Sequence, residues 1–199
     1  MKIQWLKKVS AVFCALSLAL VTAIPTRAAE TTEKTVSEYA VSSYTGLANY
    51  GDNVWQYQIN GIVQETYTGL VEYYGTWYYI ENGTLNWNYT GLTKYYDTWY
   101  YVEQGRLNWG YTGLTEYYGT WYYVEQGRLN WKYNGLTNYY DTWYYVENGV
   151  LNRNYTGLTN YYDTWYYIEQ GRLNWNYTGI TSYGNMQYYV ENGIADSRY

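Results

Sequence analysis

The hydrophobic and polar positions of this chain recur every 22 residues. Each period opens with Tyr-Thr-Gly-Leu or a close variant, continues into a Thr-Trp-Tyr-Tyr-aliphatic run, and then reaches a Glu-Asn-Gly or Glu-Gln-Gly turn. A fixed period of this length is typical of a repeat protein, in which each unit buries its apolar faces against its neighbours. The opening motif stands at 67–70, 89–92, 111–114, 133–136, 155–158 and 177–180.

The two terminal copies of the repeat are irregular. A first copy begins at Tyr44 and carries one extra residue before Trp55, and the last copy has Gln187 in place of its Trp. Seven units therefore fill residues 44–199. Atypical terminal units are expected where a repeat array is capped.

Within a unit the pattern predicts strands and tight turns, because no apolar residues recur at helical spacing. Aromatic and β-branched residues form the strongest strand signal, and the Gly-containing turns suit hairpins. We predict an all-β fold, a β-hairpin solenoid of about seven 22-residue repeats. In the unit 111–132 the predicted strands are 114–117, 120–124 and 128–131, and the predicted turns are 118–119 and 125–127.

The two faces of the central strand are both apolar. Strand alternation places Trp121 and Tyr123 on one face and Tyr122 and Val124 on the other. A hairpin alone is marginally stable in water. We therefore expect each face to pack against a different neighbouring unit.

Residues 1–28 have the features of a secretory signal peptide. Lysines precede an uncharged, mostly apolar run at 9–24, and small residues flank a cleavage site after Ala28. An uncleaved membrane anchor is the alternative, although a run of this length is short for a bilayer span. We expect a short polar lead-in at 29–43, the repeat solenoid at 44–199, and no membrane insertion after cleavage.

The composition argues against an enzyme. The chain has 34 Tyr and 11 Trp but no His, which is the commonest general base and metal ligand. A glycosidase needs two carboxylates in different environments, whereas one Glu recurs identically in each unit and is expected to serve the turn. We expect no catalytic residues, no bound metal and no cofactor. The recurring residues are Glu81, Glu103, Glu125, Glu147, Glu169 and Glu191.

The net charge of −5 bears on the kind of partner. Removal of residues 1–28 takes away four basic residues and no acidic one, which makes the remaining chain more acidic. Such a chain is a poor partner for nucleic acid and favours cations. We interpret Arg106, Arg128 and Arg172, which follow the second turn, as solvated partners of nearby acids, with a phosphate contact as the alternative.

The run Gly-Thr-Trp-Tyr-Tyr-Val at 119–124, followed by a Gly turn and Arg128-Leu129, resembles the cell-wall-binding repeats of Gram-positive surface proteins. That family includes choline-binding and glucan-binding repeats and the carbohydrate-binding repeats of clostridial toxins. The resemblance covers 44–199 and implies a β-hairpin solenoid that binds envelope polymers or sugars between consecutive units. Choline-type repeats place a Trp after the opening Gly, where this chain has Leu114. Trp131, just before the next opening, is a candidate substitute, and Arg153 replaces it in one unit.

Aromatic faces suit two kinds of ligand. They attract a quaternary ammonium by cation–π interaction, at about 0.5–2 kcal/mol per contact, and they also stack on sugar rings. For the strand Trp and Tyr residues, core packing is the alternative role. The candidate ligand-binding residues are Trp77, Tyr79, Trp87, Trp99, Tyr101, Trp109, Trp121, Tyr123, Trp131, Trp143, Tyr145, Trp165, Tyr167 and Trp175.

These features together predict a secreted, non-catalytic binding module retained at the bacterial cell surface. Its expected partner is a cell-wall polymer, either choline-bearing teichoic acid or a saccharide, held by weak sites acting in series. The alternative is a structural or adhesive surface protein whose aromatic ladder mediates self-assembly or protein contact. The oligomeric state and cooperation with a separate enzyme stay open.

Overall fold

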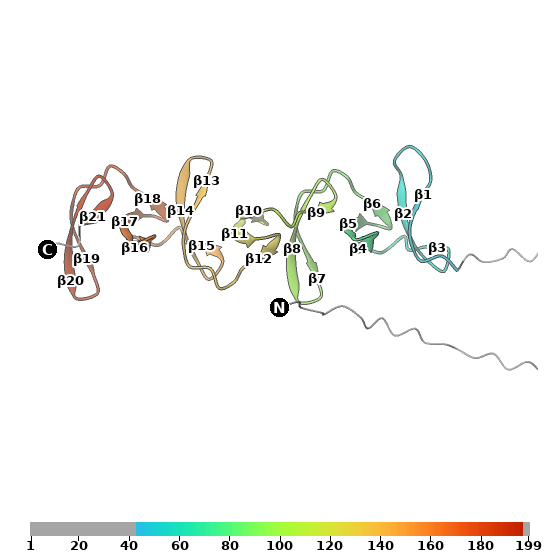
Figure 1. The fold of residues 1–199 in the computed structure, drawn as a ribbon, viewed down its shortest axis with the longest axis horizontal. Helices are drawn as coiled ribbons and strands as arrows, with labels where there is room; N and C mark the ends of the chain where they lie inside the picture. Colours follow the sequence, from blue (N-terminus) through green and yellow to red (C-terminus); the bar gives the residue numbers. More distant parts are fainter. Residues whose placement is uncertain (1–42, 197–199) are drawn as a thin grey trace, which may run out of the picture. The chain divides into compact units, whose positions relative to one another are not determined.

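The computed structural model describes residues 43–196, and every regular element in this range is a β-strand (Figure 1). The all-β repeat fold predicted from the sequence is confirmed. Within 43–196 no helix has the length and apolar character that a membrane span requires. The predicted signal peptide at 1–28, and all but the last residue of the predicted lead-in, lie outside the described residues.

Each unit contributes three strands, and antiparallel pairing joins all of them into one hydrogen-bonded network. The first strands are β1 (Gly46–Asn49), β4 (Gly69–Tyr73), β7 (Gly91–Tyr95), β10 (Gly113–Tyr117), β13 (Gly135–Tyr139), β16 (Gly157–Tyr161) and β19 (Gly179–Tyr183). The second strands are β2 (Trp55–Ile59), β5 (Thr76–Glu81), β8 (Thr98–Glu103), β11 (Thr120–Glu125), β14 (Thr142–Glu147), β17 (Thr164–Glu169) and β20 (Met186–Glu191). The third strands are β3 (Ile62–Val63), β6 (Thr84–Leu85), β9 (Arg106–Leu107), β12 (Arg128–Leu129), β15 (Val150–Leu151), β18 (Arg172–Leu173) and β21 (Ile194–Asp196).

The third strand is shorter than predicted. The sequence pattern predicted a strand over 128–131, but β12 ends at Leu129. Asn130 stops it, because its side-chain Oδ1 accepts a hydrogen bond from the backbone N–H of Lys132 at 2.9 Å and turns the chain. Trp131 therefore lies in a linker between units instead of in a strand.

Both predicted turns are tight hairpin turns. In the unit 111–132, Tyr118 and Gly119 have φ of +48° and +78°, and Gln126 and Gly127 have φ of +48° and +71°. Positive φ at both central residues defines the type I′ turn, whose twist matches that of the flanking strands. The first turn joins β10 to β11 and the second joins β11 to β12.

The second turn of each unit is attached to the unit before it. The backbone N–H of Tyr101 donates to the carbonyl oxygen of Gly127 at 2.9 Å, and Arg128 pairs across the strands with Tyr100. The fit is close, since a Cβ on Gly127 would lie 2.5 Å from the carbonyl oxygen of Asn108. Consecutive units are thus joined by backbone hydrogen bonds as well as by side chains.

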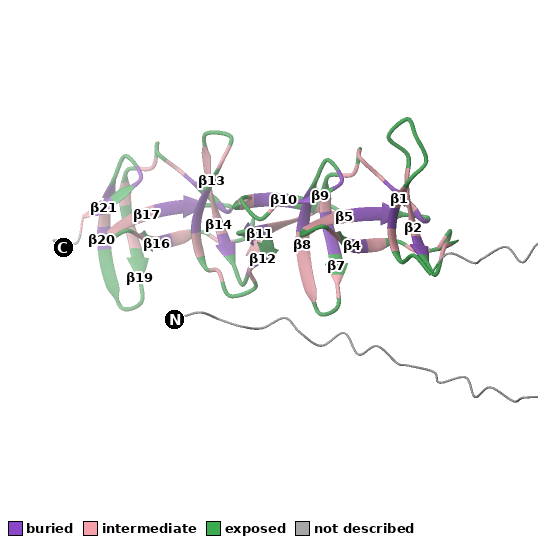
Figure 2. Ribbon diagram, turned by 45° about the vertical axis from the view of Figure 1, so that its right-hand side comes forward, coloured by how far each residue is buried: buried purple, intermediate pink, exposed green. Residues whose placement is uncertain are grey.

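The core consists of separate clusters, each shared by two consecutive units. Val124 packs with Leu92 and Tyr101 of the preceding unit, and Tyr123 packs with Val146 of the following one. The predicted assignment of the two strand faces to two neighbours is therefore confirmed. Figure 2 shows buried residues along the strands and exposed residues at the turns.

Burial of the opening aliphatic residue depends on the next unit. Leu114 is 1% exposed because Val146 of the next unit covers it, whereas Ile180, which no described unit follows, is 65% exposed. Full burial of such a side chain contributes about 1.5–3 kcal/mol. Stability is therefore a sum of nearest-neighbour contacts.

A side chain of the opening motif accepts a hydrogen bond from the second turn, and natural variation among the repeats allows the contribution of this bond to be tested. The hydroxyl of Thr112 accepts a bond from the Gln126 N–H at 3.0 Å, and in the next unit Asn134 Oδ1 accepts the matching bond from Asn148 at 2.8 Å. We expect Thr112→Ala to lower the free energy of unfolding by about 0.5–1.5 kcal/mol, and Thr112→Asn to retain most of it. Urea unfolding measures both, and equal losses in the two variants would contradict the hydrogen-bond explanation.

Candidate ligand-binding sites between repeats

A group of three aromatic rings lies at the boundary between consecutive units. The Trp99 and Tyr117 ring centroids are 5.0 Å apart at 63°, and those of Tyr117 and Tyr118 are 4.5 Å apart at 78°. The Trp comes from the second strand of one unit, and the two Tyr are the last residue of the first strand and the first residue of the first turn of the next. We call this group the first-turn cluster. Its copies are Trp55, Tyr73 and Tyr74; Trp77, Tyr95 and Tyr96; Trp99, Tyr117 and Tyr118; Trp121, Tyr139 and Tyr140; and Trp143, Tyr161 and Tyr162.

The turn tyrosine of this cluster combines backbone strain with exposure. Tyr118 is 90% exposed at φ +48°, a left-handed conformation that costs an L-residue about 1–2 kcal/mol. Burial, followed by a hydrogen bond with Tyr96, raises the pKa of Tyr95 to about 12, so this ring is neutral at physiological pH. The cluster therefore presents π faces at an exposed turn.

A groove of about 530 Å³ runs beside Trp121. The second strand of one unit supplies Trp121, and the second and third strands of the next supply Glu147, Val150 and Leu151. Asn152 donates to the Glu147 carboxylate at 2.8 Å and holds it in place. An aromatic wall, apolar side chains and an anchored carboxylate thus line one groove together with Arg153.

In the equivalent groove beside Asn53, which is lined by Glu81 and Leu85, Trp87 stands in place of Arg153. An indole and a carboxylate without a guanidinium suit an organic cation or a sugar.

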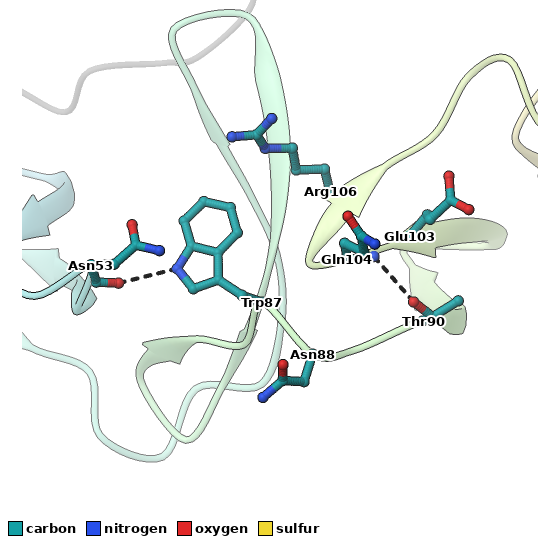
Figure 3. Close-up of a pocket in the computed structure, with 7 residues that line it drawn as sticks. All are labelled: Asn53, Trp87, Asn88, Thr90, Glu103, Gln104 and Arg106. Carbon is teal, nitrogen blue, oxygen red and sulfur yellow. Dashed lines mark hydrogen bonds between the residues drawn. The ribbon is translucent and has the colours of Figure 1, made fainter.

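A second aromatic pair lies on the linker side of four boundaries. Tyr78 and Trp87 meet edge to face, with ring centroids 5.9 Å apart at 83°. The guanidinium carbon of Arg106, from the next unit, lies 5.3 Å from the Trp87 centroid and 5.8 Å from that of Tyr78. Figure 3 shows Arg106 beside Trp87, whose indole N–H donates to the carbonyl oxygen of Asn53 at 3.1 Å. This arrangement lies in a groove of about 690 Å³, and we call it the linker slot.

The arginines lie over aromatic rings, a contact that was not expected from the sequence. Each also pairs across the strands with a glutamate of its own unit, as Arg128 does with Glu125, and the expected role as partner of nearby acids stays a prediction. Arg128 lies 5.1 Å from the Trp109 centroid and 5.7 Å from that of Tyr100, and Arg172 lies 5.5 Å from that of Tyr144. The register between units is the reason, because it pairs Arg128 with Tyr100. A guanidinium over a ring keeps its charge accessible while its alkyl stem covers apolar surface.

The five tyrosines that follow the strand Trp by two residues lie toward the core. Tyr101 is 7% exposed, and its ring stacks on Tyr111 at 3.8 Å and 19°. Since the stacked face is covered, the geometry favours the core alternative for this position, and a ligand role stays an untested prediction. The five residues are Tyr79, Tyr101, Tyr123, Tyr145 and Tyr167.

The candidate tryptophans fall into two groups. Those in the second strands are half-buried, and each contacts a tyrosine from the first turn of the next unit: Trp77, Trp99, Trp121, Trp143 and Trp165. Those in the linkers belong to the linker slots: Trp87, Trp109, Trp131 and Trp175. The linker group also reaches the first turn of the preceding unit, where the Trp87 indole N–H donates to the Asn53 carbonyl oxygen.

The recurring glutamates have the turn role expected from the sequence. Glu103 accepts a hydrogen bond at 2.8 Å from the Asn108 amide, which tethers the linker to the second turn. The same bond recurs at Glu81, Glu125, Glu147 and Glu169. Among the described residues, no group of three His, Cys, Asp or Glu side chains is placed to hold a metal ion.

Comparison with known families identifies these units. The family model described as the choline-binding repeat matches seven consecutive segments, which together make up more than half of the chain. This chain belongs to the choline-binding repeat family. The resemblance seen in the sequence is thereby confirmed. The matched segments are 43–64, 66–86, 88–108, 110–130, 132–152, 154–174 and 176–196.

Solved structures similar to this choline-binding repeat protein come from Streptococcus pneumoniae. CbpJ is 27% identical, with 77% of this chain and 52% of that chain covered and a TM-score of 0.33. CbpF is 24% identical over the same shares, with a TM-score of 0.32. The choline-binding domain of Spr1274 is 26% identical over 43% of this chain and 94% of that chain, with a TM-score of 0.25.

The aligned region spans about half the length of CbpJ and CbpF. All three TM-scores lie below 0.5, so the family assignment depends on the repeat match. A comparison with curated proteins gives no match.

Two features of this choline-binding repeat protein were missed from the sequence. The first is the exposed tyrosine of the first-turn cluster, although Tyr-Gly and Tyr-Asp occupy a turn that usually takes Asn-Gly. That departure from turn preference was the available signal. The second is the contact of arginines with the linker slots, which depends on strand register between units and has no local signal.

Proposed function

We propose that this choline-binding repeat protein is an exported, non-catalytic module that attaches to the bacterial cell wall by binding choline groups of wall polymers between successive repeats. The groove beside Trp87 carries the proposal, because it places an indole face, Leu85 and the Glu81 carboxylate along one lining. The equivalent groove beside Trp121 has the Glu147 carboxylate as well, but Arg153 takes the place of the linker Trp there. The export signal predicted at 1–28 supports a location outside the cell.

The chemistry of choline fits this lining. Its trimethylammonium group is a weakly hydrated cation, so an aromatic face attracts it at about 0.5–2 kcal/mol per contact. The Glu81 carboxylate adds charge attraction, and the net charge of −5 favours approach of a cation. Each site is weak, but repeats linked in one chain bind a polymer with many choline groups far more strongly than one repeat does.

A saccharide is the second candidate ligand. Thr120, Asn152 and Asn154 line the groove beside Trp121 and offer donors and acceptors for sugar hydroxyls, while Trp121 offers a stacking face. A purely structural role for the aromatic clusters is the third possibility. Competition for bound protein separates the three.

The test is elution of the purified chain from isolated, choline-bearing bacterial walls. We expect free choline to release the protein and ethanolamine, which lacks the three methyl groups, to release little of it at the same concentration. Walls in which ethanolamine replaces choline provide the matched control and should retain little protein. Release by oligosaccharides but not by choline would replace the proposed ligand, and retention unaffected by either competitor would favour the structural role.

A further inference from the structure

The linker slots occur in two forms that differ at one residue. The residue that follows the second-turn Gly of the next unit lies opposite the slot tyrosine. In the slot of Tyr78 and Trp87 this residue is Arg106, and in the slot of Tyr100 and Trp109 it is Arg128. In the slot of Tyr122 and Trp131 it is Val150, and in the slot of Tyr166 and Trp175 it is Ile194.

The two rings keep the same geometry with and without the arginine. The centroids of Tyr100 and Trp109, which carry Arg128, are 5.8 Å apart at 86°. Those of Tyr122 and Trp131, which face Val150, are 5.8 Å apart at 82°. The ring pair is therefore pre-formed and does not need a bound cation to hold it open.

The slots without arginine are accessible. Trp131 is 50% exposed and Trp175 is 47% exposed, close to the 44% of Trp109, which carries Arg128. The difference between the two forms is therefore the cation and not the exposure of the indole. Among residues 43–196, no arginine or lysine side chain lies over either of these rings, while Glu147 pairs across the strands with Val150 and Glu191 with Ile194. A carboxylate thus flanks a ring pair that receives no cation from the described chain.

We infer that the Tyr122–Trp131 and Tyr166–Trp175 slots bind an external organic cation, and that Arg106 and Arg128 occupy the equivalent slots as built-in ligands. The arginines show what the ring pair accepts, because a guanidinium is, like a quaternary ammonium, a weakly hydrated cation. That the external cation is the trimethylammonium group of choline rests on the proposed function.

A single residue then decides whether a boundary offers this site. Arginine supplies the cation from within the chain, and an aliphatic residue leaves the ring pair without one. These slots lie on the linker tryptophans, apart from the first-turn clusters. The array therefore carries a second, sparser set of cation sites. The unit with Arg153 in place of the linker Trp has one slot ring, Tyr144, and Arg172 already lies over it.

The test counts bound choline molecules per full-length chain by equilibrium dialysis with labelled choline. We expect Ile194→Arg to lose one site, Trp131→Leu to lose one site, and Arg128→Val to gain one. Both residue types occur naturally at the substituted position in sibling units, so Ile194→Arg and Arg128→Val are compatible with the fold. Ser182→Arg adds the same charge at an exposed strand position that pairs with Gln187 and not with a tryptophan, and it should leave the count unchanged.

The possible results separate this inference from the proposed function. If the unaltered chain binds choline and the count stays the same in the three slot variants, the inference is wrong and the proposed function stands. If Ser182→Arg lowers the count as much as Ile194→Arg does, general charge repulsion explains the loss and the inference is again wrong. If the unaltered chain binds no choline, both fail. Circular dichroism of each variant confirms that the fold is retained.

Discussion

Gly127→Ala is expected to destabilise the repeat array far more than Gly119→Ala, although both glycines occupy the same position of a type I′ turn. Gly127 has φ of +71°, which alone costs an alanine about 1–2 kcal/mol. Its Cβ would also lie 2.5 Å from the carbonyl oxygen of Asn108 and 3.0 Å from the Cα of Trp109. Both are backbone atoms, so the preceding unit has to move, and the hydrogen bond from Tyr101 to the Gly127 carbonyl weakens with it.

Gly119→Ala is the matched control. This residue has φ of +78°, and no heavy atom lies within 4 Å of an added Cβ. Only the conformational cost of about 1–2 kcal/mol is therefore expected. Urea unfolding followed by circular dichroism gives both free energies. Equal losses would mean that the contact between the second turn and the preceding linker contributes little.

The distribution of residues among the units agrees with this difference. The first turn accepts Asp at the equivalent of Gly119, as at Asp141 and Asp163, where φ is +60° and +62°. The second turn has Gly in every unit. Its glycines are Gly61, Gly83, Gly105, Gly127, Gly149, Gly171 and Gly193. Asp is accepted where the turn only requires a left-handed conformation. It is not found where the backbone of the preceding unit also lies against the turn residue.

The fold was predictable because its determinants are local and repeated. A 22-residue period, a two-faced aromatic strand such as 120–124, and Gly-containing turns leave few alternatives to stacked hairpins. The error over 128–131 was also local in origin, since the side chain of Asn130 competes with strand pairing.

The sites were less predictable, because they depend on which rings of different units meet. Trp121 and Tyr123 share a strand face, yet the opening Tyr133 of the next unit covers only the second of them by stacking at 3.7 Å. Likewise, Arg128 meets Tyr100 through pairing of residues that lie 28 positions apart. Neither contact follows from the pattern within one unit.

Alkaline pH is expected to unfold the array cooperatively. Burial raises the pKa of Tyr111 and Tyr133 well above the ordinary value of 10.0, and raises that of Tyr155 to about 12. Above pH 10.0 the unfolded chain releases phenol protons that the folded chain retains, so stability is complete below that pH and is lost as pH rises toward the folded-state pKa. The same buried tyrosine recurs from unit to unit, and the losses add.

The measurement follows circular dichroism and tyrosinate absorbance together across this pH range. Burial predicts that the last part of the absorbance change coincides with loss of β-structure, because these phenols ionise only when the units separate. Replacing Tyr111 and Tyr133 by Phe removes two of the linked ionisations and the hydrogen bonds to Leu114 and Leu136. The double variant should therefore be less stable near neutral pH, by about 0.5–1.5 kcal/mol per bond, and yet lose less stability between neutral pH and the alkaline transition. Complete ionisation before any loss of β-structure would show that these tyrosines are accessible in the folded array, and the stacked core between units would then need a different description.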